Sequence, residues 1–252
     1  IAVDLVTVNN DIDRMNTVFK LYLQAWVLFG LAGGVVLWYL TTAWGKPWQY
    51  LSIGKGAWLI ALALLLISAS IYPVLGTRAR LADRFSTQFQ GLDGAEYMET
   101  ATYRDPQGSL SLRWDREAME WLRDNVQGTP VIAEGNTPLY RWGSRVSIYT
   151  GLPAVVGWDW HQQQQRWADR DAGLVRRADV QAMYTTASIP DTVELLSRYG
   201  VRYIYVGQLE RLYYPQEGIE KFRQMEAQGL LETVYPRLPE ANSEVVIYLV
   251  VS

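Results

Sequence analysis

The sequence contains no cysteine and a single histidine, His161. The first absence excludes disulfide frameworks, zinc knuckles, thiolate nucleophiles and iron–sulfur sites, and the second excludes a His-rich metal cage. A strong excess of charge of one sign is also missing, because 23 basic residues face 26 acidic ones. A dedicated nucleic-acid-binding protein usually carries a strongly basic face. We therefore expect no nucleic-acid partner.

Charge is scarce in the N-terminal part of the chain, residues 1–76. Only seven charged residues occur there: Asp4, Asp11, Asp13, Arg14, Lys20, Lys46 and Lys55. All other charged residues follow Gly76, although the whole chain is 49% hydrophobic and 19% charged. This uneven distribution predicts a membrane segment joined to a water-soluble domain.

Two uncharged runs, Leu21–Leu40 and Ala57–Gly76, account for the apolar character of this part. Twenty residues at helical rise span about 30 Å, the thickness of the bilayer hydrocarbon core. Apolar runs of about 10 to 14 residues are typical of buried helices in soluble proteins, and these are longer. The first run starts too late for a signal peptide, and a second run follows it. We therefore predict a transmembrane hairpin over residues 21–76, with the lipid bilayer as a partner.

The loop between the two runs predicts the orientation of the hairpin. It carries Lys46 and Lys55 and no acidic residue, which places it in the cytoplasm by the positive-inside rule. Aromatic residues gather at the same end, as expected at headgroup depth: Trp38, Tyr39, Trp44, Trp48, Tyr50 and Trp58. We expect a multi-pass protein of the cell membrane, with a juxtamembrane segment (1–20) and a C-terminal domain (77–252) both extracytoplasmic.

The C-terminal domain alternates helix and strand patterns after a polar connecting stretch, residues 77–111. The spacing of apolar residues predicts helices over 115–125, 191–199 and 216–228, and strands over 131–133, 201–207, 230–235 and 244–250. Such alternation is typical of an α/β domain with a mixed, partly parallel sheet. The Gly-rich phosphate-binding and nucleophile-elbow motifs are absent, so the common nucleotide-binding and hydrolase fingerprints are excluded.

A polar cluster precedes the first apolar run. Arg14 and Lys20 lie within one or two helical turns of the membrane face, where polar residues without partners are costly. Guanidinium and ammonium groups bind phosphate oxygens strongly, so these two residues are candidates to hold a lipid-linked phosphate. Ordinary snorkelling and helix capping explain the same pattern, and we prefer that interpretation.

A second cluster, Thr150–Trp167, combines three tryptophans, an aspartate and the single histidine. Tryptophan faces stack on sugar rings or cations, while Asp and His supply directional hydrogen bonds. Trp158, Asp159, Trp160 and His161 are therefore candidates for substrate binding, on a loop that we expect to follow a strand. The alternatives, which we prefer, are a structural histidine packed against tryptophan and a helix N-cap at Asp159.

Three further features have ordinary explanations. Glu210 and Arg211 directly follow a predicted strand, where sites often form, but a surface salt bridge is the preferred interpretation. Arg176 and Arg177 indicate that their stretch of the chain presents a face to solvent. Gly30 and Gly34 form a G-x-x-x-G spacing that lets transmembrane helices approach closely, although it is common by chance.

Three stretches together carry a resemblance to a known family. Residues 14–26, 150–166 and 195–211, followed by a terminal strand, resemble the C-terminal part of the prokaryotic "YYY" membrane proteins (Chlor_Arch_YYY). These are large polytopic proteins whose architecture is similar to that of GT-C type membrane glycosyltransferases. Gly157–His161 is similar in character to the Trp-Trp-Asp-Tyr-Gly motif of oligosaccharyltransferase catalytic subunits. It departs from that motif in its second half, so peptide recognition is not carried over.

The resemblance also implies what this chain lacks. GT-C enzymes place metal-binding carboxylates in outer loops between N-terminal helices, whereas only two helices are predicted here. The chain begins at Ile1, so we expect either a C-terminal piece of a longer protein or a shortened relative. No cofactor is evident in this chain, and Mg²⁺ or Mn²⁺ is implied only for a longer parent protein.

Two hypotheses follow from these observations. The first is the C-terminal portion of a glycosyltransferase that uses a lipid-phosphate-linked sugar, with the soluble domain recognising the acceptor. The second is a non-enzymatic accessory subunit, whose helices dock on other transmembrane helices of a larger membrane complex. Whether the chain is itself an enzyme is left open by its sequence.

Overall fold

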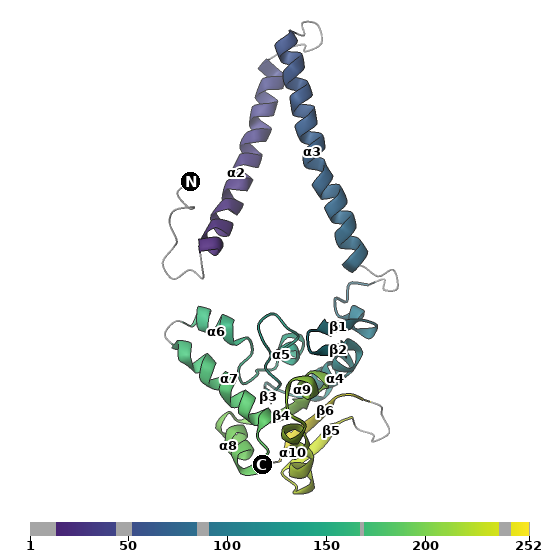
Figure 1. The fold of residues 1–252 in the computed structure, drawn as a ribbon, viewed down its shortest axis with the longest axis vertical. Helices are drawn as coiled ribbons and strands as arrows, with labels where there is room; N and C mark the ends of the chain where they lie inside the picture. Colours follow the sequence, from purple (N-terminus) through teal and green to yellow (C-terminus); the bar gives the residue numbers. More distant parts are fainter. Residues whose placement is uncertain (1–13, 44–51, 85–90, 167–168, 237–242, 252) are drawn as a thin grey trace. The chain divides into compact units, whose positions relative to one another are not determined.

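The computed structural model describes residues 14–43, 52–84, 91–166, 169–236 and 243–251. The chain divides into two compact units, Ile1–Thr87 and Gln88–Ser252. The first contains two long helices and the second an α/β domain (Figure 1). This confirms the predicted fold class.

The first unit consists of α2 (Arg14–Ala43) and α3 (Ile53–Arg84). Within them, Met15–Ala43 and Ile53–Ala82 are long and apolar enough to cross a membrane, and none of their most apolar window is buried. A core helix of a soluble protein would be covered, so the exposed apolar surface suggests a membrane as its environment. Both predicted spans lie inside these helices. The loop with Lys46 lies outside the described residues, and the sidedness of the hairpin stays a prediction.

The second unit is built on a four-stranded mixed sheet with the order β3–β4–β6–β5. The edge strand β3 (Val131–Ala133) runs parallel to its neighbour β4 (Val201–Val206). The strand β6 (Val246–Val250) pairs antiparallel with β4 and with β5 (Leu231–Tyr235). β3 and β4 therefore end at the same edge of the sheet.

Side chains alternate between the two faces of this sheet and build two cores. On β4, Ile204 and Val206 join a core with α7, α8 and α10, whereas Tyr205 joins a core with α4 on the opposite face. The helices are α4 (Leu112–Asn125), α5 (Arg145–Thr150), α6 (Asp159–Gln165), α7 (Arg170–Thr185), α8 (Ile189–Arg198), α9 (Gln208–Tyr213) and α10 (Gln216–Ala227). The domain is thus a sheet covered by helices on both faces (Figure 1).

The predicted strands and the three predicted helices of the domain are confirmed to within a few residues. The stretch 77–111 is not the simple connection that we predicted, because it contains a hairpin of β1 (Thr102–Asp105) and β2 (Gly108–Ser111). Its turn is fixed by Asp105, whose Oδ1 accepts a hydrogen bond from the Gln107 amide at 3.0 Å. The two strands have only four residues each, and a side chain stabilises the turn between them, so the hairpin shows no clear pattern of apolar residues in the sequence.

Candidate functional site

Three segments meet beyond the carboxyl ends of the parallel strands β3 and β4, where ligands often bind in α/β domains. They are the loop 134–144, the motif 157–161, and the turn at Gly207. We expected the motif to follow a strand, but the helix that precedes it is the short α5. Ala154 then forms a parallel bridge with Ile132 of β3, which draws the motif to the edge of the sheet.

The aromatic residues of the motif form an exposed stack. Gly157 adopts a φ of 66°, which favours glycine, and α6 begins two residues later. The Trp158 side chain donates from Nε1 to the Gly143 carbonyl at 3.2 Å, and the residue is 42% exposed. The His161 ring lies 5.1 Å from the Trp158 ring and meets the Tyr140 ring edge-on at 6.3 Å. We call Tyr140, Trp158 and His161 the aromatic site.

A small notch of about 20 Å³ opens beside these rings. It is large enough for one water-sized group, so a ligand would rest mainly on the ring faces. Its lining brings together three of the four predicted substrate-binding residues with the loop after β3: Asn136, Thr137, Pro138, Leu139, Tyr140, Gly143, Ser144, Gly157, Trp158, Asp159 and His161. Trp160 is half-buried and does not line this notch.

Asp159 is held by α7 rather than open to a ligand. It is 3% exposed, and its Oδ2 accepts a hydrogen bond from Arg177 Nη1 at 3.0 Å. The N-cap of α6 is Trp158, and Asp159 is the first residue of the helix. Arg177, which we expected on a solvated face, therefore ties α6 to α7.

The remaining predicted residues lie on the first unit. Lys20 is exposed on α2, and the side chain of Arg14 lies outside the described residues, so their binding of a lipid phosphate stays a prediction. A Cβ atom added at Gly30 or Gly34 would meet no described atom within 4 Å. Both glycines thus lie on an open stretch of α2, and their role in helix packing also stays a prediction.

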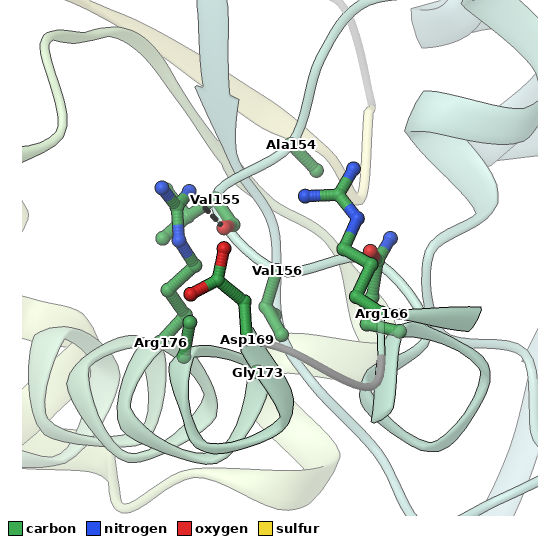
Figure 2. A pocket seen from close by; sticks show the side chains of 9 residues that line it. Ala154, Val155, Val156, Arg166, Asp169, Gly173 and Arg176 are labelled. Carbon is green, nitrogen blue, oxygen red and sulfur yellow. Dashed lines mark hydrogen bonds between the residues drawn. The ribbon is translucent and has the colours of Figure 1, made fainter. Parts of the chain in front are cut away.

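A larger pocket of about 210 Å³ lies between α6 and α7 (Figure 2). We call it the α6–α7 pocket. Its polar side chains are Gln162, Arg166, Asp169 and Arg176, and its apolar side is formed by Ala154, Val155, Val156, Ala172 and Gly173. Sequence patterns do not predict this pocket, because its walls come from three separate segments.

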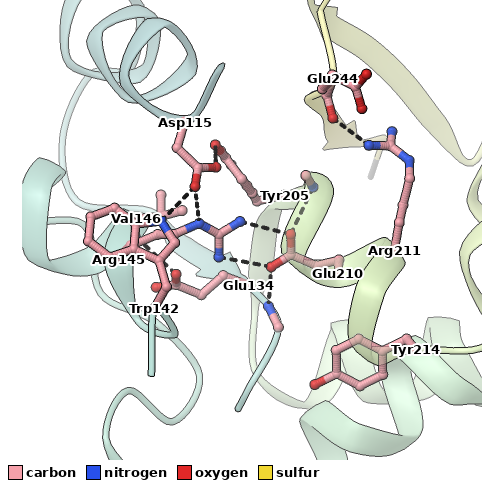
Figure 3. A network of polar contacts seen from close by, with 12 residues as sticks. Asp115, Glu134, Trp142, Arg145, Val146, Tyr205, Glu210, Arg211, Tyr214 and Glu244 are labelled. Atoms are coloured by element: carbon pink, nitrogen blue, oxygen red, sulfur yellow. Dashed lines mark hydrogen bonds and ion pairs between the residues drawn. The ribbon is translucent and has the colours of Figure 1, made fainter. Parts of the chain in front are cut away.

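Behind the aromatic site, a buried network joins α4, α5 and α9 (Figure 3). The Arg145 guanidinium donates to Asp115 Oδ2 at 2.7 Å and to both Glu210 oxygens at 3.1 and 2.9 Å. Asp115 also accepts hydrogen bonds from Trp142 Nε1 and the Tyr205 hydroxyl, each at 2.7 Å. All three ionic groups are at most 5% exposed.

The charges of this network are mutually compensated. Burial alone lowers the pKa of Arg145, but the charges of Asp115 and Glu210 outweigh burial and raise it above its ordinary value. Burial alone raises the pKa of Glu210, but Arg145 and the amides of Gly207 and Gly135 lower it below its ordinary value. Glu210 is therefore ionised and paired, which suits a brace between elements better than an acid–base catalyst.

Glu134 borders this network and is poised to titrate. Its two oxygens accept hydrogen bonds from the amides of Val146 and Ser147, both at 3.0 Å, at the first turn of α5. Burial raises the pKa of Glu134 to about 7, although the nearby charge of Arg145 opposes this shift.

The preferred interpretation of Glu210 as part of a surface salt bridge is wrong. Glu210 is fully buried, and its partner is Arg145 rather than a residue close to it in the sequence. The burial of Asp115 could have been predicted from the sequence, because Asp115 lies on the same helical face as the apolar Met119 and Leu122. No comparable signal exists for Arg145, since α5 is only six residues long.

The resemblance stated above implies Mg²⁺ or Mn²⁺ only in a longer parent protein. Among the residues that the structure describes, no group of three or more His, Asp or Glu side chains is placed to hold a metal ion. The buried carboxylates of Asp115, Glu134, Asp159 and Glu210 are already taken by Arg145, by Arg177 and by backbone amides. We therefore assign no metal-dependent step to this chain.

Comparison with known proteins gives a likeness in structure. No family model matches the sequence, and no curated protein does. Among solved structures, the chain is similar to the C-terminal globular domain of the oligosaccharyltransferase AfAglB-S2 from Archaeoglobus fulgidus. The match covers 54% of this chain and 96% of that one, with 13% sequence identity and a TM-score of 0.32. A likeness at this level carries no argument about function.

Proposed function

We propose that this chain is the C-terminal portion of a GT-C-like membrane glycosyltransferase, related to the YYY proteins, that acts with a lipid-phosphate-linked sugar. Its α/β domain recognises the acceptor. The observation that carries this proposal is the aromatic site, where a 42% exposed indole lies beside the His161 ring, which in turn meets the Tyr140 ring, at the edge of a parallel strand pair. Such faces bind flat, partly apolar ligands that also need hydrogen bonds, as sugars do.

Within this proposal the four residues of the motif have different tasks. Trp158 stacks on the acceptor, and His161 lies beside it as a hydrogen-bonding partner. Asp159 ties α6 to Arg177 of α7 and so orients the Trp158 indole. Trp160 supports α6 from its half-buried position. The carboxylates that stabilise the sugar transition state come from elsewhere in the parent protein.

The first unit anchors this domain in the bilayer, with the domain on the extracytoplasmic side. Two exposed apolar helices of sufficient length support the anchor. Arg14 and Lys20, at the start of α2, then lie where they reach the phosphate of a lipid carrier.

Binding of neutral oligosaccharides to the purified full chain tests the acceptor site. We expect Trp158→Ala to weaken binding about two- to tenfold, since ring stacking contributes about 0.5 to 1.5 kcal/mol and 1.4 kcal/mol is a factor of ten. Trp158→Phe, which retains a ring, serves as the matched control and retains most of the binding. Equal affinity of all three proteins, or a lowered melting temperature as the only effect, would show a structural role.

A second candidate function is that of a non-enzymatic accessory subunit. It is favoured by the pairing of Asp115, Glu134, Asp159 and Glu210, each of which is engaged by a cation or a backbone amide. The open face of α2 at Gly30 and Gly34 suits docking on other transmembrane helices. Mild detergent extraction distinguishes the candidates, because a stoichiometric complex containing a 28.7 kDa chain favours the accessory subunit. A longer parent polypeptide with outer-loop Asp pairs favours the enzyme.

A further inference from the structure

We propose that the α6–α7 pocket is a binding site for an anionic group, phosphate or carboxylate, which it holds between the guanidinium groups of Arg166 and Arg176. The pocket has a volume of about 210 Å³, which is enough for a small ligand group. Both guanidinium groups line it, from opposite sides (Figure 2).

The charge of the lining is positive. Two guanidinium groups and the single carboxylate of Asp169 leave one net positive charge at the pocket. Among the described residues, no ion pair joins Asp169 to either arginine, so the cations are not neutralised by direct contact. Guanidinium groups bind carboxylate and phosphate oxygens in a two-pronged geometry, which makes them suited to such anions.

Arg176 is already oriented for this task. Its Nη1 donates to the Val155 carbonyl at 3.0 Å, and its guanidinium lies 5.2 Å from the centre of the Tyr199 ring. A guanidinium has five N–H donors, so several are left for a ligand. Holding it in place beforehand reduces the entropy cost of binding.

Arg166 completes the pair from the C-terminal end of α6. Its amide closes the last turn of the helix by donating to the Gln162 carbonyl at 3.0 Å. Within the described part of the chain, its guanidinium makes no hydrogen bond or ion pair. The helices α6 and α7 lie close together at Gly173, where an added Cβ would be in ordinary van der Waals contact, at 3.5 Å, with the Asp159 carbonyl oxygen and the Gln162 Cβ. The geometry therefore brings two guanidinium groups to the same pocket, and that of Arg176 is held in place.

This site is separate from the aromatic site and does not depend on the proposed function. Asp159 and His161 of α6 line the notch beside the aromatic rings, whereas Gln162 and Arg166 line the α6–α7 pocket. The two proposals can therefore fail independently. If Trp158→Ala loses acceptor binding and keeps anion binding, the result bears on the proposed function and not on the α6–α7 pocket.

Titration calorimetry on the full chain in detergent tests the site with three probes: glucose 1-phosphate, glucuronate and glucose. We expect at least one charged probe to bind and glucose not to bind, and comparison of the first two separates a phosphate from a carboxylate ligand. Added salt weakens the binding of a charged ligand. Arg166→Gln and Arg176→Gln each weaken it about tenfold, as expected for a charge-assisted hydrogen bond.

Two further variants separate this role from folding and from general charge. Asp169→Asn removes a carboxylate from the pocket, and we expect it to tighten anion binding, which a misfolded protein would not do. Arg123→Gln removes an exposed arginine of α4 and leaves the affinity unchanged. The proposal is overturned if neither charged probe binds at millimolar concentration, if Arg123→Gln weakens binding as much as Arg166→Gln, or if Asp169→Asn leaves the affinity unchanged.

Discussion

At the scale of single residues, Arg145 joins two helices of the domain through buried ion pairs. It pairs with two carboxylates, one from α4 and one from α9, and its guanidinium lies 5.0 Å from the centre of the Tyr205 ring. A buried ion pair adds little stability over an apolar replacement, but removing one partner leaves uncompensated buried charge. The role of Arg145 is therefore to fix how these elements meet beneath the aromatic site.

Arg145→Met tests this role, because methionine fills much of the volume and removes the charge. We expect the free energy of unfolding of the domain to fall by about 3 to 5 kcal/mol, since Asp115 and Glu210 lose their shared partner. Chemical denaturation followed by circular dichroism measures this change. Arg113→Gln, which breaks an exposed pair with Glu117, is the control and leaves stability nearly unchanged. Equal stability of both variants would contradict the proposed role.

Glu134 gives the domain a specific pH dependence. Its pKa is about 7 in the folded state and near 4.5 in the unfolded state, so the folded state keeps a proton that the unfolded state loses between these values. Stability from this group is therefore largest below about pH 4.5 and falls as the pH rises to about 7. The full shift corresponds to roughly 3 kcal/mol.

Melting temperatures of the wild type and Glu134→Gln between pH 4.5 and 8 check this dependence. Glutamine does not titrate, so we expect the advantage of the wild type over the variant to shrink as the pH rises. The exposed Glu232→Gln is the control, and its difference from the wild type stays nearly constant. A constant difference for Glu134→Gln as well would contradict the raised pKa.

The sequence predicts one half of the residue-level site and not the other. Trp158, Asp159 and His161 are nearly adjacent in the chain, so a turn of helix is enough to bring them together. Arg145 is 30 residues from Asp115 and 65 from Glu210, and only the tertiary fold joins them. The pocket between Arg166 and Arg176 depends in the same way on the meeting of separate segments.

At the scale of elements, apolar periodicity predicts three of the longer helices of the domain and misses α7, which has 16 residues, together with the short helices. The helices α4, α8 and α10 and the strand β4 follow regular apolar spacing and were predicted nearly at their observed bounds. The helices α5, α6 and α9 have six or seven residues, and their apolar pattern is too short to detect. These short helices carry Arg145, Asp159 and Glu210, so the least predictable elements form the site.

The contact of α10 with α7 depends on Gly218. A Cβ atom at this position would lie 2.9 Å from the Thr185 carbonyl oxygen and closer still to that of Tyr184. We expect Gly218→Ala to lower the free energy of unfolding by about 1 to 3 kcal/mol, because the backbone of α7 would have to shift. Thermal unfolding measures this effect. Gly94→Ala meets no atom within 4 Å and should be neutral, so similar losses in both variants would contradict the close contact.

At the scale of the whole molecule, the chain joins two units whose surfaces differ in polarity. The first unit exposes apolar side chains along both helices, and the second buries its apolar side chains in two cores around a sheet. The sequence predicts this division because charge is nearly absent from residues 1–76. It also predicts the orientation, on the strength of Lys46 and Lys55.

Because residues 1–252 contain no cysteine, single cysteines introduced into this chain, expressed by itself, report its orientation without background. We expect Ser109→Cys, exposed on β2, to react in intact cells with a membrane-impermeant maleimide. Ser52→Cys, exposed just before α3, reacts only after the cells are lysed. The opposite pattern would place the α/β domain in the cytoplasm and exclude an extracytoplasmic acceptor.

The central claim is that the aromatic site recognises the acceptor of a glycosyltransferase. The most direct measurement compares the surface glycans of cells with the wild-type gene, a deletion and Trp158→Ala, by mass spectrometry of released glycans. We expect the deletion to lose one class of glycan, Trp158→Ala to lose much of the same class at normal protein level, and Trp158→Phe to keep most of it. An unchanged glycan profile in the deletion, or a full profile in Trp158→Ala, would contradict the account.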